Sequence, residues 1–395
     1  MQFSQEHDLF RTSVREMLAR TVAPRYEEWE KAGRFPAHEL FPEFAKLGLL
    51  GLEYDPAYGG EGADHWFTVI ACEEFGRLPG NGIPMAYNVQ ANMATPSLHK
   101  HGSDELKREY LVPAISGEQI CSIAVTEPDA GSDVAGIRTR AVRDGADWLI
   151  TGAKTYITNG VQGDWLCLLV RTSDEGGYRG MSQVIVPTKS PGLTVSRSLA
   201  KLGNWCSDTA ELTFDRVRVP VGNTIGEIGR GFQQQMEQFQ TERISAVYQA
   251  VGQMETAIEL TIDYLQQRPA FGARLIDNQY LQYTLAELAC EVDALKRYAH
   301  SCAELIVAGA DVTRRTSSAK LLAGKLIRRV ADTCLQYHGG MGYMAETWTS
   351  RFFRDSRLLS IGGGADEVML RVLARDLISK QFFDDPEKSQ EAGRQ

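Results

Sequence analysis

The sequence lacks any long apolar run. No stretch of its 395 residues approaches the roughly 18 consecutive apolar residues that suggest a membrane-spanning helix. Its opening residues, MQFSQEHDLF, are too polar for the apolar core of a secretory signal peptide. These two absences predict a soluble cytoplasmic protein that has no membrane partner.

Paired cysteines and metal-binding patterns are also missing. The seven cysteines are odd in number, lie far apart, and form neither a C-x-x-C pair nor a Cys/His ligand pair. We therefore expect buried, reduced thiols and no metal site. The sequence also has no G-x-S-x-G elbow and no H-E-x-x-H pair, which argues against hydrolase or zinc chemistry.

An excess of positive charge is the third absence. The 42 lysines and arginines are outnumbered by 51 aspartates and glutamates, which gives a net charge of -9. This balance disfavours nonspecific binding to nucleic acid or to anionic membranes. An anionic substrate therefore needs basic groups that are placed locally.

The sequence does contain enough apolar residues, 43%, for a large interior in a chain too long for one ordinary core. Short β-prone runs such as WLCLLV (165–170) and QVIV (183–186) interrupt two regions of helical spacing, the second of which contains Ile244 and Val251. We predict an α+β multidomain fold. Its expected parts are an N-terminal α-helical domain at 1–120, a middle antiparallel β-domain at 121–226, a C-terminal four-helix bundle at 227–383, and a polar tail at 384–395.

The most specific motif is AVTEPDAGSD at residues 124–133. Its turns are broken by proline and glycine, and they present the Thr126 and Ser132 hydroxyls beside free backbone N–H groups. Such a loop suits the edge of a flavin ring and a phosphate. On its own, the segment is better explained as an ordinary polar turn that leaves a strand.

Further motifs follow in order and extend the pattern over nearly the whole chain. Together with the first motif they resemble the acyl-CoA dehydrogenase family of flavoproteins, in particular its long-chain and isovaleryl-type branch. The resemblance implies FAD as cofactor, an acyl-CoA substrate from fatty acid metabolism by β-oxidation, and an electron-transferring flavoprotein as acceptor. The further motifs are TYITNG (155–160), WCSDTA (205–210), RPAFG (268–272) and QYHGGMGY (336–343).

The resemblance implies two groups of cofactor-binding residues. The first surrounds the isoalloxazine, with Ser132 near the flavin pyrophosphate or the bound thioester and Tyr156 where the family often has tryptophan; it comprises Ile123, Val125, Thr126, Ser132, Tyr156 and Thr158. The second reaches the diphosphate and adenosine of a neighbouring subunit; it comprises Arg268, Phe271, Gln279, Gln336 and Gly340. This sharing implies a homo-oligomer, a tetramer or a dimer. The alternatives are a tyrosine in a half-buried strand and an arginine that caps a helix in solvent.

One motif is rejected. GMGYMA at residues 340–345 fits the G-x-G-x-x-A dinucleotide fingerprint as a string, but it follows a helical run rather than a strand, so it is not a Rossmann turn. We expect its glycines to end a helix and to let the backbone approach the cofactor. His338 is then a structural histidine rather than a catalyst.

The family's reaction removes the α-proton of an acyl thioester and sends the β-hydrogen as hydride to flavin N5. Many members carry the base in a C-terminal Tyr-Glu-Gly-Thr loop, but the matching residues here are GGGA (362–365), with Gly363 in place of Glu. Members without that carboxylate carry a Glu-Arg pair on the first helix of the C-terminal domain, where Glu242 and Arg243 stand here. The resemblance thus implies Glu242 as the base, the Gly363 N–H as a donor to the thioester carbonyl, and Arg243 as a contact for CoA.

Helical geometry places Glu242 opposite the apolar stripe, on a polar face that it shares with Gln238 and Gln249. We expect this face to line a ligand cleft or to meet water, and the alternative is that Glu242 is an ordinary solvated helix residue. Gly363 and Ala246 leave room beside the base. They predict a pocket that tolerates long or branched acyl chains.

Other functions are compatible with the same motifs. An acyl-CoA oxidase or a flavin monooxygenase differs in how oxygen meets reduced flavin, and a monooxygenase needs no α-proton base. A DNA-associated, alkylation-response homologue needs a basic surface, which the net charge of -9 disfavours. A flavin-free structural homologue is the remaining alternative.

Overall fold

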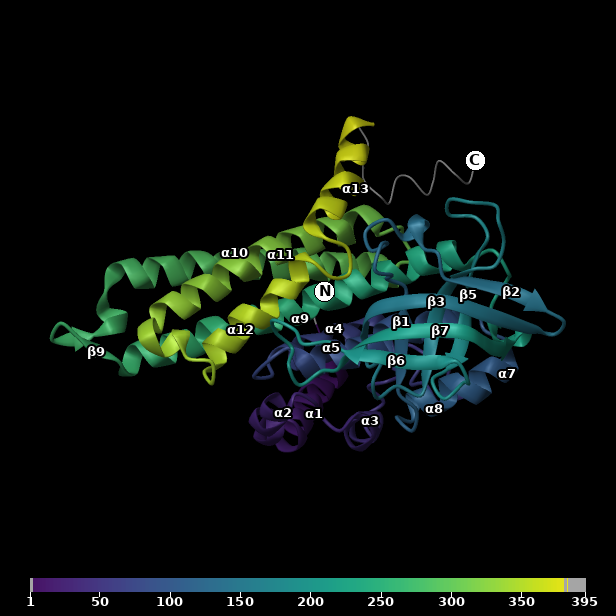
Figure 1. Cartoon of the computed structure of the whole chain (residues 1–395). Helices are drawn as coiled ribbons and strands as arrows, with labels where there is room; N and C mark the ends of the chain where they lie inside the picture. Colours follow the sequence, from purple (N-terminus) through teal and green to yellow (C-terminus); the bar gives the residue numbers. More distant parts are fainter. Residues whose placement is uncertain (1–2, 380–381, 383–395) are drawn as a thin grey trace.

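The computed structural model describes residues 3–379 and residue 382, so the predicted tail at 384–395 lies outside the described residues. The predicted α+β fold is confirmed. Figure 1 shows the long C-terminal helices extending from one side of a β-sheet, with the N-terminal helices below. The boundaries at 120/121 and 226/227 stay a prediction.

The N-terminal part consists of short helices with clear start signals. Ser4 caps α1 by accepting the His7 N–H, and the Asp64 carboxylate caps α4 by accepting the Trp66 N–H. The helices pack in one hydrophobic core with the C-terminal helices. Their bounds are α1 Gln5–Thr21, α2 Tyr26–Ala32, α3 Ala37–Ala45, α4 His65–Gly76, α5 Gly82–Asn88, α6 Pro96–His101, α7 Asp104–Leu106 and α8 Val112–Ile115, with π-helical segments at Val89–Ala94 and Lys107–Leu111.

The middle part is a single sheet in the order β6-β7-β3-β2-β4-β5-β8, with β1 paired to β4. Most pairs are antiparallel, as predicted, but β1 and β2 each pair with β4 in parallel. These two parallel pairings join strands that are not consecutive, so local sequence patterns do not reveal them. The bounds are β1 Cys121–Ala124, β2 Arg140–Asp144, β3 Asp147–Thr158, β4 Trp165–Arg171, β5 Met181–Pro187, β6 Leu193–Ser198, β7 Thr209–Pro220 and β8 Thr224–Ile225.

The C-terminal bundle is built around α9. This helix crosses α4 at two glycines: a Cβ on Gly252 would stand 2.2 Å from the Glu73 carbonyl oxygen, and a Cβ on Gly76 would stand 2.2 Å from the Gln249 carbonyl oxygen. The backbones therefore touch, which holds the helix that carries Glu242 directly against the N-terminal part. The bounds are α9 Gly231–Gln267, α10 Gln279–Val307, α11 Thr313–Tyr337, α12 Trp348–Ser356 and α13 Asp366–Ile378, with the hairpin strands β9 Pro269–Ala270 and β10 Ala273–Arg274 between α9 and α10.

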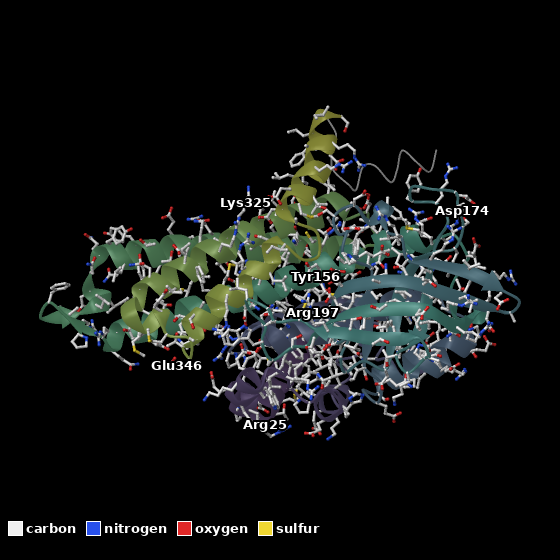
Figure 2. All side chains as sticks on the ribbon, viewed as in Figure 1. Arg25, Tyr156, Asp174, Arg197, Lys325 and Glu346 are labelled. Carbon is white, nitrogen blue, oxygen red and sulfur yellow. The ribbon has the colours of Figure 1, made fainter. Side chains whose placement is uncertain are left out.

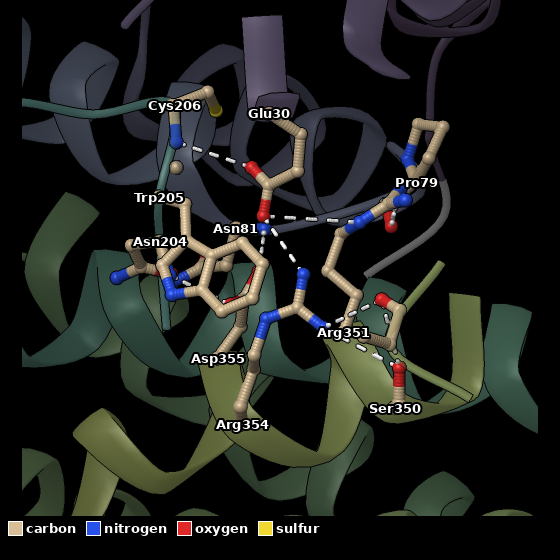
Figure 3. Close-up of polar contacts among 12 residues, drawn as sticks. Glu30, Pro79, Asn81, Asn204, Trp205, Cys206, Ser350, Arg351, Arg354 and Asp355 are labelled. Carbon is tan, nitrogen blue, oxygen red and sulfur yellow. Dashed lines mark hydrogen bonds and ion pairs between the residues drawn. The ribbon is translucent and has the colours of Figure 1, made fainter. Parts of the chain in front are cut away.

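A buried polar junction ties the parts together, as shown in Figure 3. Glu30 of α2 accepts hydrogen bonds from Arg354 Nη2 at 3.1 Å and from the Cys206 N–H at 3.1 Å. Asp355 of α12 accepts the N–H groups of Asn204 at 2.7 Å and of Asn81 at 3.0 Å. The WCSDTA segment therefore has a structural role: Glu30 binds the N–H of its second residue, Cys206, and Asp355 binds the N–H of Asn204, the residue just before it.

The cysteines are free thiols, and all are buried except Cys290. The expectation of buried thiols is therefore wrong at this position. Leu288 and Val292 lie on the buried side of α10, and Cys290, between them, turns to the solvent side.

Candidate functional site

The structure brings together the two residues predicted to carry the chemistry, Glu242 and Gly363. Gly363 lies in the segment before α13 with φ +63°, a backbone conformation that favours glycine. A Cβ added to it would stand 3.2 Å from Glu242 Oε1. The missing side chain therefore lets the Glu242 carboxyl group lie against the backbone of this segment.

The Glu242 side chain is isolated in a buried position. Glu242 is 9% exposed, so it is not a solvated surface residue, and within residues 3–379 no hydrogen bond or ion pair joins its carboxyl group to another residue. Burial raises the pKa of Glu242 to about 7, against the opposing charges of Arg243 and Lys320. A carboxyl group with this pKa and no partner is suited to accept a proton at neutral pH.

Two glutamines of the polar face do not line an open cleft, so the expectation is wrong for them. Gln238 accepts the Ser97 N–H at 3.2 Å and donates to the Met93 carbonyl, and Gln249 donates to the Pro84 carbonyl at 3.0 Å. These glutamines are buried against the N-terminal helices. Helical periodicity identifies a polar face but does not show which element will cover it.

Two cations hold the glycine segment through its carbonyl groups. Arg243 Nε donates to the Gly363 carbonyl at 3.4 Å, and its guanidinium lies 5.7 Å from the centre of the Phe239 ring. Lys320 of α11 donates to the Gly364 carbonyl. Sequence reasoning missed Lys320, although a lysine among the buried residues Ala319 and Ala323 was an available signal.

The predicted flavin segments of β1 and β3 are adjacent. The Thr155 N–H donates to the Thr126 carbonyl at 2.9 Å, and Lys154 Nζ donates to the Val125 carbonyl at 2.7 Å. Ile123, Val125 and Phe239 belong to one apolar cluster, which joins these segments to the helix of Glu242. Thr158 is half-buried at the end of β3, and Ser132 is exposed on the loop between β1 and β2.

Tyr156 has the unusual geometry of a functional position. It is 69% exposed, its φ is +60°, and it lies where the pairing of β3 with β7 shifts register. Figure 2 shows it where the sheet meets the long helices. Bulges and left-handed non-glycine residues occur preferentially beside active sites. The exposed ring follows Thr155, whose N–H is bonded to Thr126, and it fits a planar group such as the flavin; a half-buried strand tyrosine is excluded.

Sequence reasoning also missed a buried ion pair beneath these segments. Lys154 is fully buried and lies 2.9 Å from Glu127 Oε1. Glu127 also accepts the Arg138 N–H at 2.6 Å and the Thr139 N–H at 2.9 Å. The pair therefore fixes the backbone of the AVTEPDAGSD loop from below.

The second group of predicted cofactor residues lies elsewhere on the chain. Arg268 and Phe271 lie at the hairpin of β9 and β10, which forms the end of the bundle remote from the sheet in Figure 1. The GGMGY segment follows α11, as predicted, and packs beside this hairpin end through His338, whose ring stacks on Tyr264 at 4.1 Å. All of the group is exposed: Arg268, Phe271, Gln279, Gln336 and Gly340.

His338 is a structural residue in this arrangement. Its Nδ1 lies 2.7 Å from the Cys334 carbonyl, and burial lowers its pKa. The ring is thus committed to the end of α11. No contact joins it to Glu242 in the described part of the chain.

Family models of acyl-CoA dehydrogenases match consecutive parts of the chain: the N-terminal domain at residues 4–118, the middle domain at 122–217 and the C-terminal domain at 229–378. The chain belongs to the acyl-CoA dehydrogenase family. It is therefore an oxidoreductase that acts on acyl-CoA, in a flavoprotein family of fatty acid metabolism that binds FAD. The resemblance in the motifs is confirmed.

Relatives and solved structures agree with this assignment. The mitochondrial long-chain specific acyl-CoA dehydrogenase of Sus scrofa is 36% identical over 378 residues, which cover 95% of this chain and 87% of the relative. A probable acyl-CoA dehydrogenase from Mycobacterium abscessus has a TM-score of 0.92 at 38% identity and covers 95% of this chain and 99% of its own. Glutaryl-CoA dehydrogenase from Mycobacterium smegmatis, solved in complex with FADH2, has a TM-score of 0.90 at 29% identity, over 96% of each chain.

A further relative bears on partners and on reaction direction. The caffeyl-CoA reductase-Etf complex subunit CarC of Acetobacterium woodii is 31% identical over 382 residues, which cover 96% of this chain and 100% of the relative.

Within the described part of this dehydrogenase, no helix is both long enough and apolar enough to cross a bilayer.

Proposed function

We propose that this dehydrogenase converts an acyl-CoA thioester to the trans-2-enoyl-CoA, with Glu242 as the base that removes the α-proton. The observation that carries the proposal is the buried Glu242 carboxyl group, which has no hydrogen-bond or ion-pair partner among residues 3–379, has a pKa raised to about 7 and lies against the backbone of Gly363. FAD, when bound, supplies the acceptor for the β-hydride.

The proposed division of labour follows from acidity. A thioester α-proton is far too weakly acidic for a carboxylate alone, so a donor must stabilise the negative charge that develops on the carbonyl oxygen. The Gly363 N–H takes this role, since no side chain obstructs its approach. Arg243, which donates to the Gly363 carbonyl, contributes positive charge that favours an anionic CoA ligand.

For FAD, we propose that the group around Thr126 and Tyr156 contacts the isoalloxazine within one subunit. The group around Arg268 and Gln336 then serves the FAD of a neighbouring copy, because it lies at the end of the bundle remote from the sheet. The protein is proposed to be a homo-oligomer, a tetramer or a dimer. Sedimentation velocity of the FAD-bound protein tests this, and a monomer contradicts it.

The proposed substrate carries a long or branched acyl chain. Gly363 has no side chain above the base, and Ala246 is small and half-buried one turn further along α9. A panel of acyl-CoA thioesters of increasing length and branching measures the preference as kcat/KM. Oxidation confined to butyryl-CoA and shorter thioesters contradicts the proposal.

We propose an electron-transferring flavoprotein as the acceptor. The relative from Acetobacterium woodii, named as part of an Etf complex, supports this. The name of this relative also denotes a reductase, so both the oxidation of acyl-CoA and the reduction of enoyl-CoA are assayed. Reoxidation of the reduced enzyme by oxygen faster than by an electron-transferring flavoprotein supports an oxidase instead.

The deciding experiment is Glu242→Gln. We expect the rate of anaerobic flavin bleaching by acyl-CoA to fall about a thousandfold, because the amide accepts no proton, while the flavin spectrum stays intact. Glu237→Gln is the matched control, since Glu237 lies on the same helix and pairs with Lys100 at the surface. A wild-type bleaching rate in Glu242→Gln contradicts the base assignment.

A further inference from the structure

Lys320 is a buried cation next to the proposed base. It is 1% exposed, and it lies on the inner side of α11 among the buried residues Thr316, Ala323 and Ile327. A charge in such surroundings is costly unless other groups compensate it. Its ammonium group donates to the Gly364 carbonyl, in the segment that faces Glu242.

The charges around Lys320 come from two other helices. Asp366 at the start of α13 and Glu242 of α9 favour its protonated form, and Arg243 of α9 opposes it. Burial outweighs the carboxylates and lowers the pKa of Lys320 to about 8. Asp366 Oδ2 is itself held by Arg328 at 3.3 Å.

No ion pair joins Lys320 to a carboxylate in the described part of the chain. Its hydrogen bond goes to a neutral carbonyl. The lysine is therefore not explained as half of a salt bridge, and what it holds is the glycine segment.

That segment needs to be held. Gly363 and Gly364 have φ of +63° and +97°, and consecutive glycines lose more conformational freedom on folding than any other residues. Arg243 and Lys320, from two different helices, tie successive carbonyls of the segment. Fixing these carbonyls fixes the peptide planes on both sides of Gly364, and the first of these planes begins at the α-carbon of Gly363.

We propose that Lys320 is a positioning residue, which holds the Gly363–Gly364 backbone in register with Glu242 and supplies positive charge that favours the carboxylate form of Glu242. The inference rests on the proposed role of Glu242 as the base. It adds a role for a residue that does not itself touch the reacting atoms.

The test separates the hydrogen bond from the charge. Lys320→Met removes both, Lys320→Gln keeps a donor for the Gly364 carbonyl without the charge, and Lys320→Arg keeps both. Lys325→Met is the matched control, because Lys325 is an exposed lysine on the same helix (Figure 2). Anaerobic flavin bleaching by acyl-CoA is measured for each FAD-bound protein from about pH 5.5 to about pH 9.

Removal of a nearby cation raises the pKa of a carboxyl group, and the base must be ionised to act. In Lys320→Met we therefore expect the acid limb of the pH profile to move up by about one unit and the plateau rate to fall about tenfold. In Lys320→Gln we expect the acid limb to move as far as in Lys320→Met, but the plateau rate to fall less. Lys320→Arg and Lys325→Met stay close to wild type.

A merely structural role is distinguishable. If Lys320→Met and Lys320→Gln lose rate equally at every pH with no movement of the acid limb, or yield no folded flavoprotein, the inference is overturned. Glu242→Gln is measured in the same series. A wild-type bleaching rate in Glu242→Gln contradicts the proposed base. If Glu242→Gln bleaches slowly but the acid limb of the pH profile does not move in Lys320→Met, only the inference about Lys320 is contradicted.

Discussion

The backbone of Gly363 lies against the carboxyl group of Glu242, so that a Cβ on the glycine would stand 3.2 Å from Oε1. The absent side chain of the glycine is thus what allows the carboxyl group to approach this closely. This relationship gives a physical reason why a chain without a loop carboxylate carries a buried one on α9.

Gly363→Ala tests this complementarity. The new methyl group would crowd Glu242 and would also occupy a left-handed backbone conformation, which costs about 1 to 2 kcal/mol for an L-residue. We expect flavin reduction by acyl-CoA to slow about tenfold or more, with FAD still bound. Gly33→Ala is the matched control, since Gly33 has φ +69° with no atom within 4 Å of its added Cβ. Equal rates in both variants would show that the contact with Glu242 is irrelevant.

The stability of Glu242→Gln should depend on pH. Burial raises the pKa of Glu242 in the folded protein to about 7, so its contribution favours folding below the unfolded pKa of about 4.3 and is lost as pH rises through about 7. Glutamine does not ionise. We expect the variant to gain on the order of 3 kcal/mol over wild type at about pH 8 but only about 1 kcal/mol at about pH 5. Denaturant unfolding of both proteins at the two pH values measures this difference in the free energy of unfolding.

The comparison needs a surface control. Glu287→Gln, on the exposed side of α10, should change stability little at either pH. An equal gain for Glu242→Gln at both pH values would mean that the carboxyl group is not desolvated as the structure places it.

Breaking the Lys154–Glu127 pair should loosen the predicted flavin segments. Lys154→Met leaves the Glu127 charge buried, with an expected loss of about 3 kcal/mol of stability and faster release of FAD. The double variant Lys154→Met/Glu127→Gln should recover part of the stability, because no charge remains unpaired. Thermal unfolding and the appearance of free flavin fluorescence report the two effects. A double variant that is less stable than Lys154→Met alone would refute this account.

The crossing of α4 and α9 predicts a steric effect at Gly252. Its added Cβ would stand 2.2 Å from the Glu73 carbonyl oxygen, so Gly252→Ala must push the helices apart, at a cost of about 1 to 3 kcal/mol. Gly222→Ala, where no atom lies within 4 Å of the added Cβ, is the control. Unfolding in urea distinguishes them, and equal midpoints would contradict the close crossing.

Much of the fold was readable from local patterns. The apolar stripe from Ile244 onward lies inside α9, and WLCLLV and QVIV lie inside β4 and β5. The rejection of a Rossmann turn holds because the glycines follow α11 directly. Local spacing sufficed in these places, since a helix or strand period is a property of a few consecutive residues.

The features that the sequence analysis predicted wrongly or missed depend on contacts between residues distant in the sequence. The face of Gln238 and Gln249 is covered by N-terminal helices, and the parallel pairings of β4 join strands that are distant in sequence. Lys154 and Lys320 went unnoticed because lysine is usually a surface residue. Each of these features depends on which helices and strands pack against one another, and a short stretch of sequence does not contain that information.

The sequence by itself determined the order of helical and β regions, the family, the absence of a carboxylate at position 363 and the presence of one at 242. Only the tertiary structure decided that Glu242 is buried, that Gly363 faces it, and that Arg243 and Lys320 hold the glycine segment. The physical reason is that a side chain's pKa and its burial are set by its neighbours. At Glu242 those neighbours come from α9, α11 and the segment before α13, which folding alone brings together.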